Sequence, residues 1–294
     1  MGMKKNALLL ILIACVSLVY AQTHIHVWVN GVETSFPIAS VDSITFISAE
    51  PDYSHGIGTF SVSDTSQVTF SKGNLQYHPK NDEWRFAEQQ TDYVGNANTN
   101  ISSTYDGWID LFGKGTGDNP TCCSNVHADY YTSVEWGVNA IGEDAPNTWR
   151  TLTYAEWQYL LDLRNNASEL RGVAQVNGVN GMVFLPDDWV CPSDITFKAG
   201  YHASWGKANY AAYQTITADQ WNKMQEAGAI FLPAAGYRGE KKVIDLQDIG
   251  RYWSATNDPY SDFMAGYITM YSDDAFMMYS MRYYGMSVRL VKDL

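Results

Sequence analysis

Two helix-start signals among short strand patterns constrain the fold of this chain most. In TLTYAEWQYLLDLRNNA, Thr153 and Glu156 form a capping box, whose side chains satisfy amides that the first helical turn leaves free. In TITADQWNKMQEAG, Thr217 and Gln220 repeat the pattern, and Gly228 is a typical helix stop. Strand patterns surround both segments without β–α–β alternation. The sequence therefore predicts an antiparallel α+β domain and not a parallel nucleotide-binding sheet.

Each predicted helix leads into an apolar run that ends in Leu-Pro, namely GMVFLPDDW and GAIFLPAAGY. The correspondence predicts related strand endings, although it is too short for an internal repeat. Residues 91–147 are instead rich in Gly, Asn, Ser, Thr and aromatic residues. We expect a long structured loop region there, because Trp108, Ile109, Leu111 and Phe112 need burial.

The first 21 residues are typical of a secretory signal, with Lys4 and Lys5 before an apolar run and small-residue spacing that favours cleavage before Gln22. In a second interpretation, Leu12-Ile13-Ala14-Cys15 is a lipobox, which would leave an acylated Cys15 and association with an outer membrane. The apolar run is short for a membrane span, which needs about 20 residues. Both interpretations predict an exported protein.

A small β unit is predicted at residues 22–50, before a linker at 51–57 and a main domain at 58–294. HIHVWVNGVETSF alternates around Asn30-Gly31, a strong hairpin signal, and VDSITFI adds a further strand pattern. So short a piece cannot bury a core by itself. It is expected to pack on the main domain or to act as a spacer.

The charge of the chain excludes one class of partner. Its 19 Lys and Arg residues against 32 Asp and Glu give a formal net charge of −13. Nucleic acid is not an expected partner, because phosphate contacts need clustered cations. The 20 Tyr and 10 Trp residues fit either a ring-rich core or surface rings that stack on sugars and anchor protein interfaces, and composition leaves both open.

Cysteine and histidine patterns give little support for a metal site. After removal of the signal, Cys122, Cys123 and Cys191 remain, and one of the adjacent pair could bridge to Cys191 in an oxidising compartment. Adjacent cysteines are poorly spaced to chelate one ion, and the histidines show no zinc spacing. The sequence therefore predicts no metal site and no cofactor.

Several ordered motifs resemble a known superfamily. WRTLTYAEWQYLLDLR and the closing GMSVRLV resemble a helix and the final strand of the formylglycine-generating-enzyme superfamily. More specifically, FSVSDTSQVTFSKGNLQY, VNGVNGMVFLPDDW, GAIFLPAAGYR and RYWSAT resemble the FISUMP-type (major paralogous domain) bacterial secreted proteins. The resemblance extends from about Gly58 to the end of the chain. It implies a C-type-lectin-like fold, in which a twisted mixed or antiparallel sheet, two main helices and long loops present a binding face.

The resemblance also bears on catalysis. Enzymatic members of the superfamily carry a cysteine pair near the C-terminus that binds copper and oxidises a substrate thiol, whereas this chain has no cysteine after Cys191. The resemblance therefore implies a non-catalytic member. Calcium stays possible, because lectin-like loops often hold it, although no loop matches a recognisable calcium pattern. The implied location is extracellular or at the cell surface of a Gram-negative-type bacterium.

The candidate ligand-binding site lies between Trp253 and Gly285, the segment that is variable in related lectin-like proteins. Rings alternate there with short polar side chains, as in antibody loops. The competing interpretation is strand core, which Tyr267, Ile268 and Met270 fit by alternation. The predicted ligand-binding residues are Asn257, Asp258, Tyr260, Asp262, Tyr271, Asp273, Asp274, Tyr279 and Tyr283.

Three functions follow from these patterns. The first is a non-catalytic recognition module that binds a glycan or protein ligand through its C-terminal loops. The second is a carbohydrate-active or other enzyme with an unrecognised site. The third is a structural fimbrial or matrix component of the cell surface.

Overall fold

The computed structural model describes residues 23–29, 32–41 and 56–294 and divides the chain into two compact units, residues 1–50 and 51–294. The signal segment with Cys15, the Asn30-Gly31 turn, the VDSITFI strand pattern after Val41 and linker residues 51–55 lie outside the described residues. Within the described ranges, no helix has the length and apolar character needed to cross a membrane.

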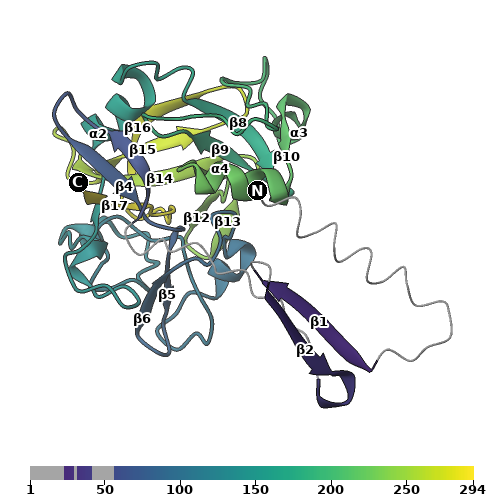
Figure 1. Ribbon diagram of the computed structural model, residues 1–294. Coiled ribbons are helices and arrows are strands. Elements are labelled where there is room, and N and C mark those ends of the chain that lie inside the picture. Colours follow the sequence, from purple (N-terminus) through teal and green to yellow (C-terminus); the bar gives the residue numbers. More distant parts are fainter. Residues whose placement is uncertain (1–22, 30–31, 42–55) are drawn as a thin grey trace. The chain divides into compact units, whose positions relative to one another are not determined.

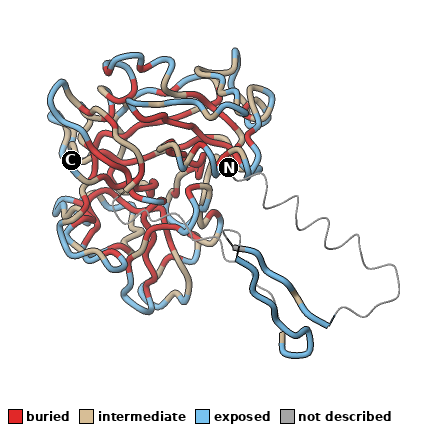
Figure 2. The backbone as a smooth tube through the Cα atoms, in the orientation of Figure 1, coloured by how far each residue is buried: buried red, intermediate tan, exposed pale blue. Residues whose placement is uncertain are grey.

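The first unit contains a two-stranded antiparallel ribbon. Strands β1 (His24–Val29) and β2 (Val32–Pro37) pair from His24↔Pro37 to Val29↔Val32, and a 3₁₀ turn, η1 (Ile38–Ser40), follows. This pairing confirms the hairpin register that the alternation predicts. Figure 2 shows the ribbon as almost entirely exposed. A two-stranded ribbon by itself is marginally stable in water.

The second unit is a mixed α+β domain, which confirms the predicted class (Figure 1). Both capping boxes are present: Thr153 and Glu156 begin α2, and Thr217 and Gln220 begin α4. The long loop region contains only short 3₁₀ helices. The helical bounds are α2 (Tyr154–Gln158), continued by the π-helical turn η5 (Tyr159–Leu163), α3 (Asn209–Tyr213), α4 (Ala218–Glu226), η2 (Gly95–Asn100), η3 (His127–Tyr130) and η4 (Trp136–Val138).

Strands of the second unit form three larger sheets and two ribbons. The first sheet has the order β3 (Ile57–Ser61), β4 (Gln67–Phe70), β17 (Leu290–Asp293), β7 (Arg150–Thr151). The second has the order β10 (Thr215–Ile216), β8 (Arg171–Val176), β9 (Val179–Phe184), β11 (Ile230–Pro233). The third is β14 (Gly250–Asn257), β15 (Met264–Met270), β16 (Ala275–Met281), and the ribbons are β5 (Leu75–His78) with β6 (Glu83–Phe86) and β12 (Tyr237–Gly239) with β13 (Lys242–Ile244).

The two apolar runs that end in Leu-Pro lie in the second sheet. The two Leu-Pro runs supply β9 and β11, which pair antiparallel from Ile230↔Phe184 to Pro233↔Gly181. The similar runs are therefore neighbouring strands of one sheet.

At the domain boundary, the sequence places Ile57 in the linker, but it is the buried first residue of β3. An apolar side chain at this position contributes to the core and does not belong to a polar connection.

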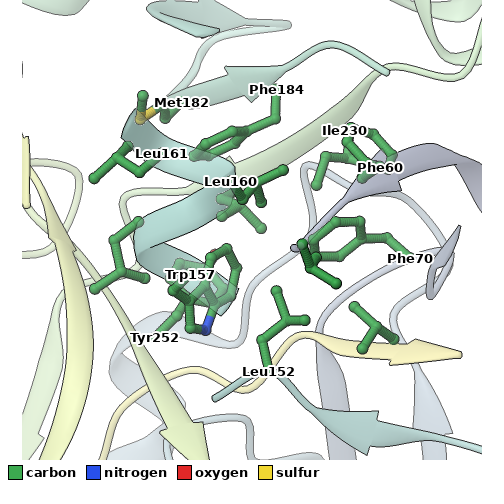
Figure 3. Packing of buried hydrophobic residues seen from close by; sticks show 14 of the residues in the cluster. Phe60, Phe70, Leu152, Trp157, Leu160, Leu161, Met182, Phe184, Ile230 and Tyr252 are labelled. Carbon is green, nitrogen blue, oxygen red and sulfur yellow. The ribbon is translucent and has the colours of Figure 1, made fainter. Parts of the chain in front are cut away.

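The main core lies where α2 and η5 meet the three larger sheets (Figure 3). Trp157, Leu160 and Leu161 are fully buried against Phe60 and Phe70 and against the strands β9 and β11. Truncating a buried Trp to Ala typically costs about 3–5 kcal/mol. The helical segment α2–η5 therefore packs in a core to which all three larger sheets contribute.

A second cluster of rings surrounds the long loop region. Ile109, Leu111 and Phe112 are buried as predicted, whereas Trp108 is half-buried with the Arg85 guanidinium 3.8 Å from its ring centroid. The Trp253 indole N–H donates a 2.8 Å hydrogen bond to the Phe112 carbonyl and ties the loop region to the third sheet. The loop region is therefore part of the packed domain.

Candidate functional site

The third sheet positions all nine predicted ligand-binding residues, but it does not bring them together. Asp258, Tyr260 and Asp262 lie in the loop between β14 and β15, and Asn257 ends β14. Tyr279 and Tyr283 lie near the same end of the sheet, because Met264 pairs with Met281. Tyr271, Asp273 and Asp274 form the turn between β15 and β16. Seven-residue strands at about 3.3 Å per residue separate the two ends by roughly 20 Å, so the single predicted patch is divided.

The turn between β15 and β16 uses its polar groups mainly to build itself. The Tyr271 amide donates to the Asp274 carbonyl at 2.7 Å, and the Asp274 carboxylate accepts from the Ala275 amide at 2.8 Å. The Tyr271 ring stacks on Phe276 with centroids 5.9 Å apart. Asp273 is half-buried. These contacts give Tyr271 and Asp274 a structural role at this end of the sheet.

At the opposite end, Tyr279 stacks on Tyr154, the first residue of α2. Their ring centroids are 4.9 Å apart and the rings are nearly parallel, at 11°. The stack depends on Gly266, where a Cβ would lie 2.7 Å from the Tyr154 ring. Asp258 accepts a hydrogen bond from the Tyr260 amide at 2.9 Å, and the Tyr260 side chain is 95% exposed. One face of the Tyr279 ring is therefore covered by the Tyr154 ring and is not open to a ligand.

A continuous run of rings begins at Tyr283, and we call it the tyrosine-rich surface. The Tyr283 ring lies 4.8 Å from Tyr284 and 5.2 Å from His127. His127 in turn lies 4.6 Å from Phe263, and Tyr284 lies 5.5 Å from Tyr237. Phe263 also lies 6.0 Å from Tyr131. The tyrosine-rich surface thus consists of Tyr131, Phe263, His127, Tyr283, Tyr284 and Tyr237.

Exposure varies along this surface, and its residues Tyr237 and Tyr284 also pack against the second cluster of buried rings. Tyr131 and Phe263 are exposed, at 51% and 42%, and the other four residues are half-buried. Contiguous exposed rings on a soluble protein commonly mark an interaction site. Tyr267, Ile268 and Met270 are buried, which confirms the competing interpretation of those three residues as strand core.

A hollow of about 420 Å³ adjoins the surface at Tyr283 and Tyr284. Its remaining lining comes from Asn125 and the turn of the β12–β13 ribbon, Gly239, Glu240, Lys241 and Lys242. Asn125 donates a 2.7 Å hydrogen bond to the Glu240 carboxylate. The volume lies within the range of about 300–1,000 Å³ that is usual for ligand pockets.

Arg238 holds the two walls of the hollow in place. Its guanidinium is buried and donates to the Glu240 carbonyl at 2.5 Å and to the Cys122 carbonyl at 3.3 Å. Burial lowers the pKa of Arg238. One side chain thereby links the β12–β13 turn to the loop that carries Asn125, so the hollow is framed before any ligand binds.

A buried group of charges lies next to Tyr283. The Lys114 ammonium is fully buried and pairs with Glu135, and the Lys114 amide donates to the Arg282 carbonyl at 2.8 Å. Arg282 is also buried and donates to the Asp262 carbonyl at 3.4 Å. Asp262, a predicted ligand residue, therefore contributes its backbone to the anchoring of the β14–β15 loop.

Thiols and metal ligands do not form a centre in the part of the chain that the structure describes. Cys122, Cys123 and Cys191 are free thiols, so the bridge to Cys191 that the sequence allowed is not formed. Within residues 23–29, 32–41 and 56–294, no group of three or more His, Cys, Asp or Glu side chains is arranged to hold a metal ion.

Of the tyrosine-rich surface, Tyr283 is among the nine predicted ligand-binding residues, and Tyr284 belongs to the wider ring-rich segment that the sequence indicates. Phe263 and Tyr284 lie inside the predicted segment, where ring content alone did not distinguish them from strand core. His127 and Tyr131 lie in the loop region 91–147, and Tyr237 follows a Leu-Pro run. A search for rings in every long loop, and not only in the C-terminal segment, would have found His127 and Tyr131.

Comparisons of this chain with protein-family models, curated proteins and solved structures find no match.

Proposed function

We propose that this protein is a non-catalytic, exported recognition module that binds a glycan through the tyrosine-rich surface. The observation that carries the proposal is the run of six rings from Tyr131 to Tyr237 beside a hollow of about 420 Å³. Tyrosine rings present an apolar face and a polar tip at low conformational cost, which suits sugars.

The fold that we propose is the C-type-lectin-like fold of the FISUMP-type and formylglycine-generating-enzyme-like proteins. The motifs between Gly58 and the C-terminus support this assignment, as does the mixed α+β architecture with its long ordered loops. The absence of any cysteine after Cys191 supports a binding role over the oxidase chemistry of the enzymatic members. The signal-like leader supports an extracellular or cell-surface location.

A glycan array followed by calorimetry with purified protein tests the proposal. Tyr283→Ala and Phe263→Ala should each weaken glycan binding by about tenfold or more, because truncating an anchoring aromatic residue commonly costs at least 1.4 kcal/mol. Tyr260→Ala and Tyr271→Ala are matched controls that remove an equally large ring outside the tyrosine-rich surface.

The two controls should bind as the unmodified protein does. Equal loss in all four variants would place recognition in the dispersed residues of the C-terminal segment. No loss in Tyr283→Ala or Phe263→Ala, with binding intact, would refute a role for the tyrosine-rich surface.

A further inference from the structure

We propose that the hollow beside Tyr283 and Tyr284 selects a carboxylated sugar, a uronate residue of an acidic polysaccharide. The proposal rests on the proposed function and deepens it. It depends on two features of the hollow, its local charge and the geometry of its rings.

The charge of the hollow is opposite to that of the chain. Lys241 and Lys242 both line it and are exposed. Three other lysines pair with carboxylates, in Lys80–Asp106, Lys114–Glu135 and Lys223–Asp194, whereas Lys241 and Lys242 belong to the described lysines that do not. Among the described residues, no carboxylate lies within ion-pair distance of Lys241 or Lys242. Two unmatched amines on a chain of net charge −13 form a local site for an anion.

The one carboxylate in the lining is already engaged. Glu240 accepts the hydrogen bond from Asn125, while its backbone carbonyl accepts from Arg238. Its backbone has a φ of +49°, in the left-handed region that costs a residue with a side chain. These contacts hold Glu240 against the wall of the hollow, where its single negative charge is outnumbered by the two amines.

The rings favour a sugar over an acidic peptide. Tyr283 and Tyr284 lie 4.8 Å apart at 56° to one another, so together they form an angled wall. A pyranose ring presents a rigid C–H face that can pack on such a wall, while its carboxylate reaches the amines at the edge. An acidic peptide carries its carboxylates on flexible chains without a comparable face, and it would lose more conformational entropy on binding.

The experiment compares an oligogalacturonate with its fully methyl-esterified form by calorimetry at low and high salt. The two probes share the ring and hydroxyl groups and differ in charge. We expect the acidic form to bind about tenfold more tightly at low salt and to lose this advantage at high salt, because exposed charges are screened. Tyr283→Ala should weaken the binding of both forms.

Three variants test how much the charges of the hollow contribute to the affinity for the acidic form. The double variant Lys241→Gln with Lys242→Gln should bind the acidic form only about as tightly as the ester. Its affinity for the ester should equal that of the unmodified protein. Lys72→Gln with Lys292→Gln makes the same change of charge outside the hollow and should have little effect. Glu240→Gln keeps an acceptor for Asn125, removes the carboxylate, and should tighten binding of the acidic form several-fold.

The results separate this inference from the proposed function. Equal binding of acid and ester, an unchanged affinity in the Lys241/Lys242 double variant, or no binding of the acidic form would overturn the selection of a uronate, even where Tyr283→Ala still abolishes binding of another glycan. Binding of poly-glutamate as tight as that of the oligogalacturonate would overturn the preference for a sugar. If Tyr283→Ala weakened the binding of no glycan, the proposed function itself would be overturned.

Discussion

Lys114 is a cation that the fold keeps out of water. Its side chain is fully buried, and its ammonium pairs with Glu135 and lies 5.5 Å from the Trp136 ring centroid. Burial lowers the pKa of Lys114, although Glu135 acts against this shift. The side chain of Glu135 is 34% exposed, so Lys114 depends more on the ion pair than Glu135 does.

We expect Glu135→Gln to be more destabilising than Lys114→Met. The first change leaves a buried cation without its anion, which typically costs about 3–5 kcal/mol. The second removes the buried cation itself, and the positive charge of Arg282 still acts on the remaining Glu135 carboxylate. Urea unfolding of both variants measures the difference, and a larger loss in Lys114→Met would show that Glu135 is the partner that needs compensation.

Asp110 gives the domain a predictable response to pH. Burial raises the pKa of Asp110 to about 6, against the lowering effect of hydrogen bonds from Asn98 and Val94. The folded protein therefore holds a proton that the unfolded chain, with a carboxyl pKa near 4, has released. The free energy of unfolding should fall by about 2 kcal/mol as the pH rises from about 4 to about 6, and by about 3 kcal/mol in total once the pH is well above the folded-state pKa.

The measurement is chemical unfolding across this pH range with Asp110→Asn as the comparison. This variant cannot titrate, so the Asp110 contribution to the slope should vanish. Its overall stability should be lower, because an amide N–H₂ would face the Val94 or Asn98 donor that now bonds to the carboxylate. An identical slope in both proteins would assign the pH response to other groups.

Among the elements, α2 depends most on its cap. It contains only five α-helical residues before the π-helical turn, too few to be stable through propensity alone. The cap carboxylate of Glu156 also pairs with Arg150 of β7, which in turn contacts Asp293 of β17. The start of the helix is thus tied to two strands of the first sheet.

We expect Thr153→Ala to lower the free energy of unfolding by about 1–2 kcal/mol and Thr217→Ala by about 0.5–1 kcal/mol. Both changes remove a capping hydroxyl, but the Thr153 cap is partly buried and begins a helix of only five α-helical residues, whereas the Thr217 cap lies at the surface. Thermal and urea unfolding of the two variants compare them directly. A larger loss in Thr217→Ala would mean that the Arg150 contacts hold α2 without its cap.

At the scale of the whole molecule, local signals in the sequence predicted local structure well. Thr153, Glu156, Thr217 and Gln220 act within one helical turn, so their pattern is sufficient to locate both helix starts. The alternation of Tyr267 also predicted its burial. The α+β class followed from the order of such elements.

The arrangement of the site could not be predicted from such local patterns. Tyr279 and Tyr283 are only four residues apart, yet β16 ends at Met281 between them, and their rings stack on different partners. The tyrosine-rich surface joins residues from 127 to 284 through long-range pairing. Periodicity describes one segment at a time and contains no information on which loops meet.

The place of β17 has a consequence for the order in which this domain assembles. The strand lies between β4 and β7, and its pairing joins Val291 to Phe70. During synthesis, β3 and β4 must wait for β17, which follows β4 by about 220 residues, before their sheet is complete. Such distant pairing slows folding and leaves a strand edge uncovered meanwhile. Helper proteins that shield nascent chains would be needed most in that interval.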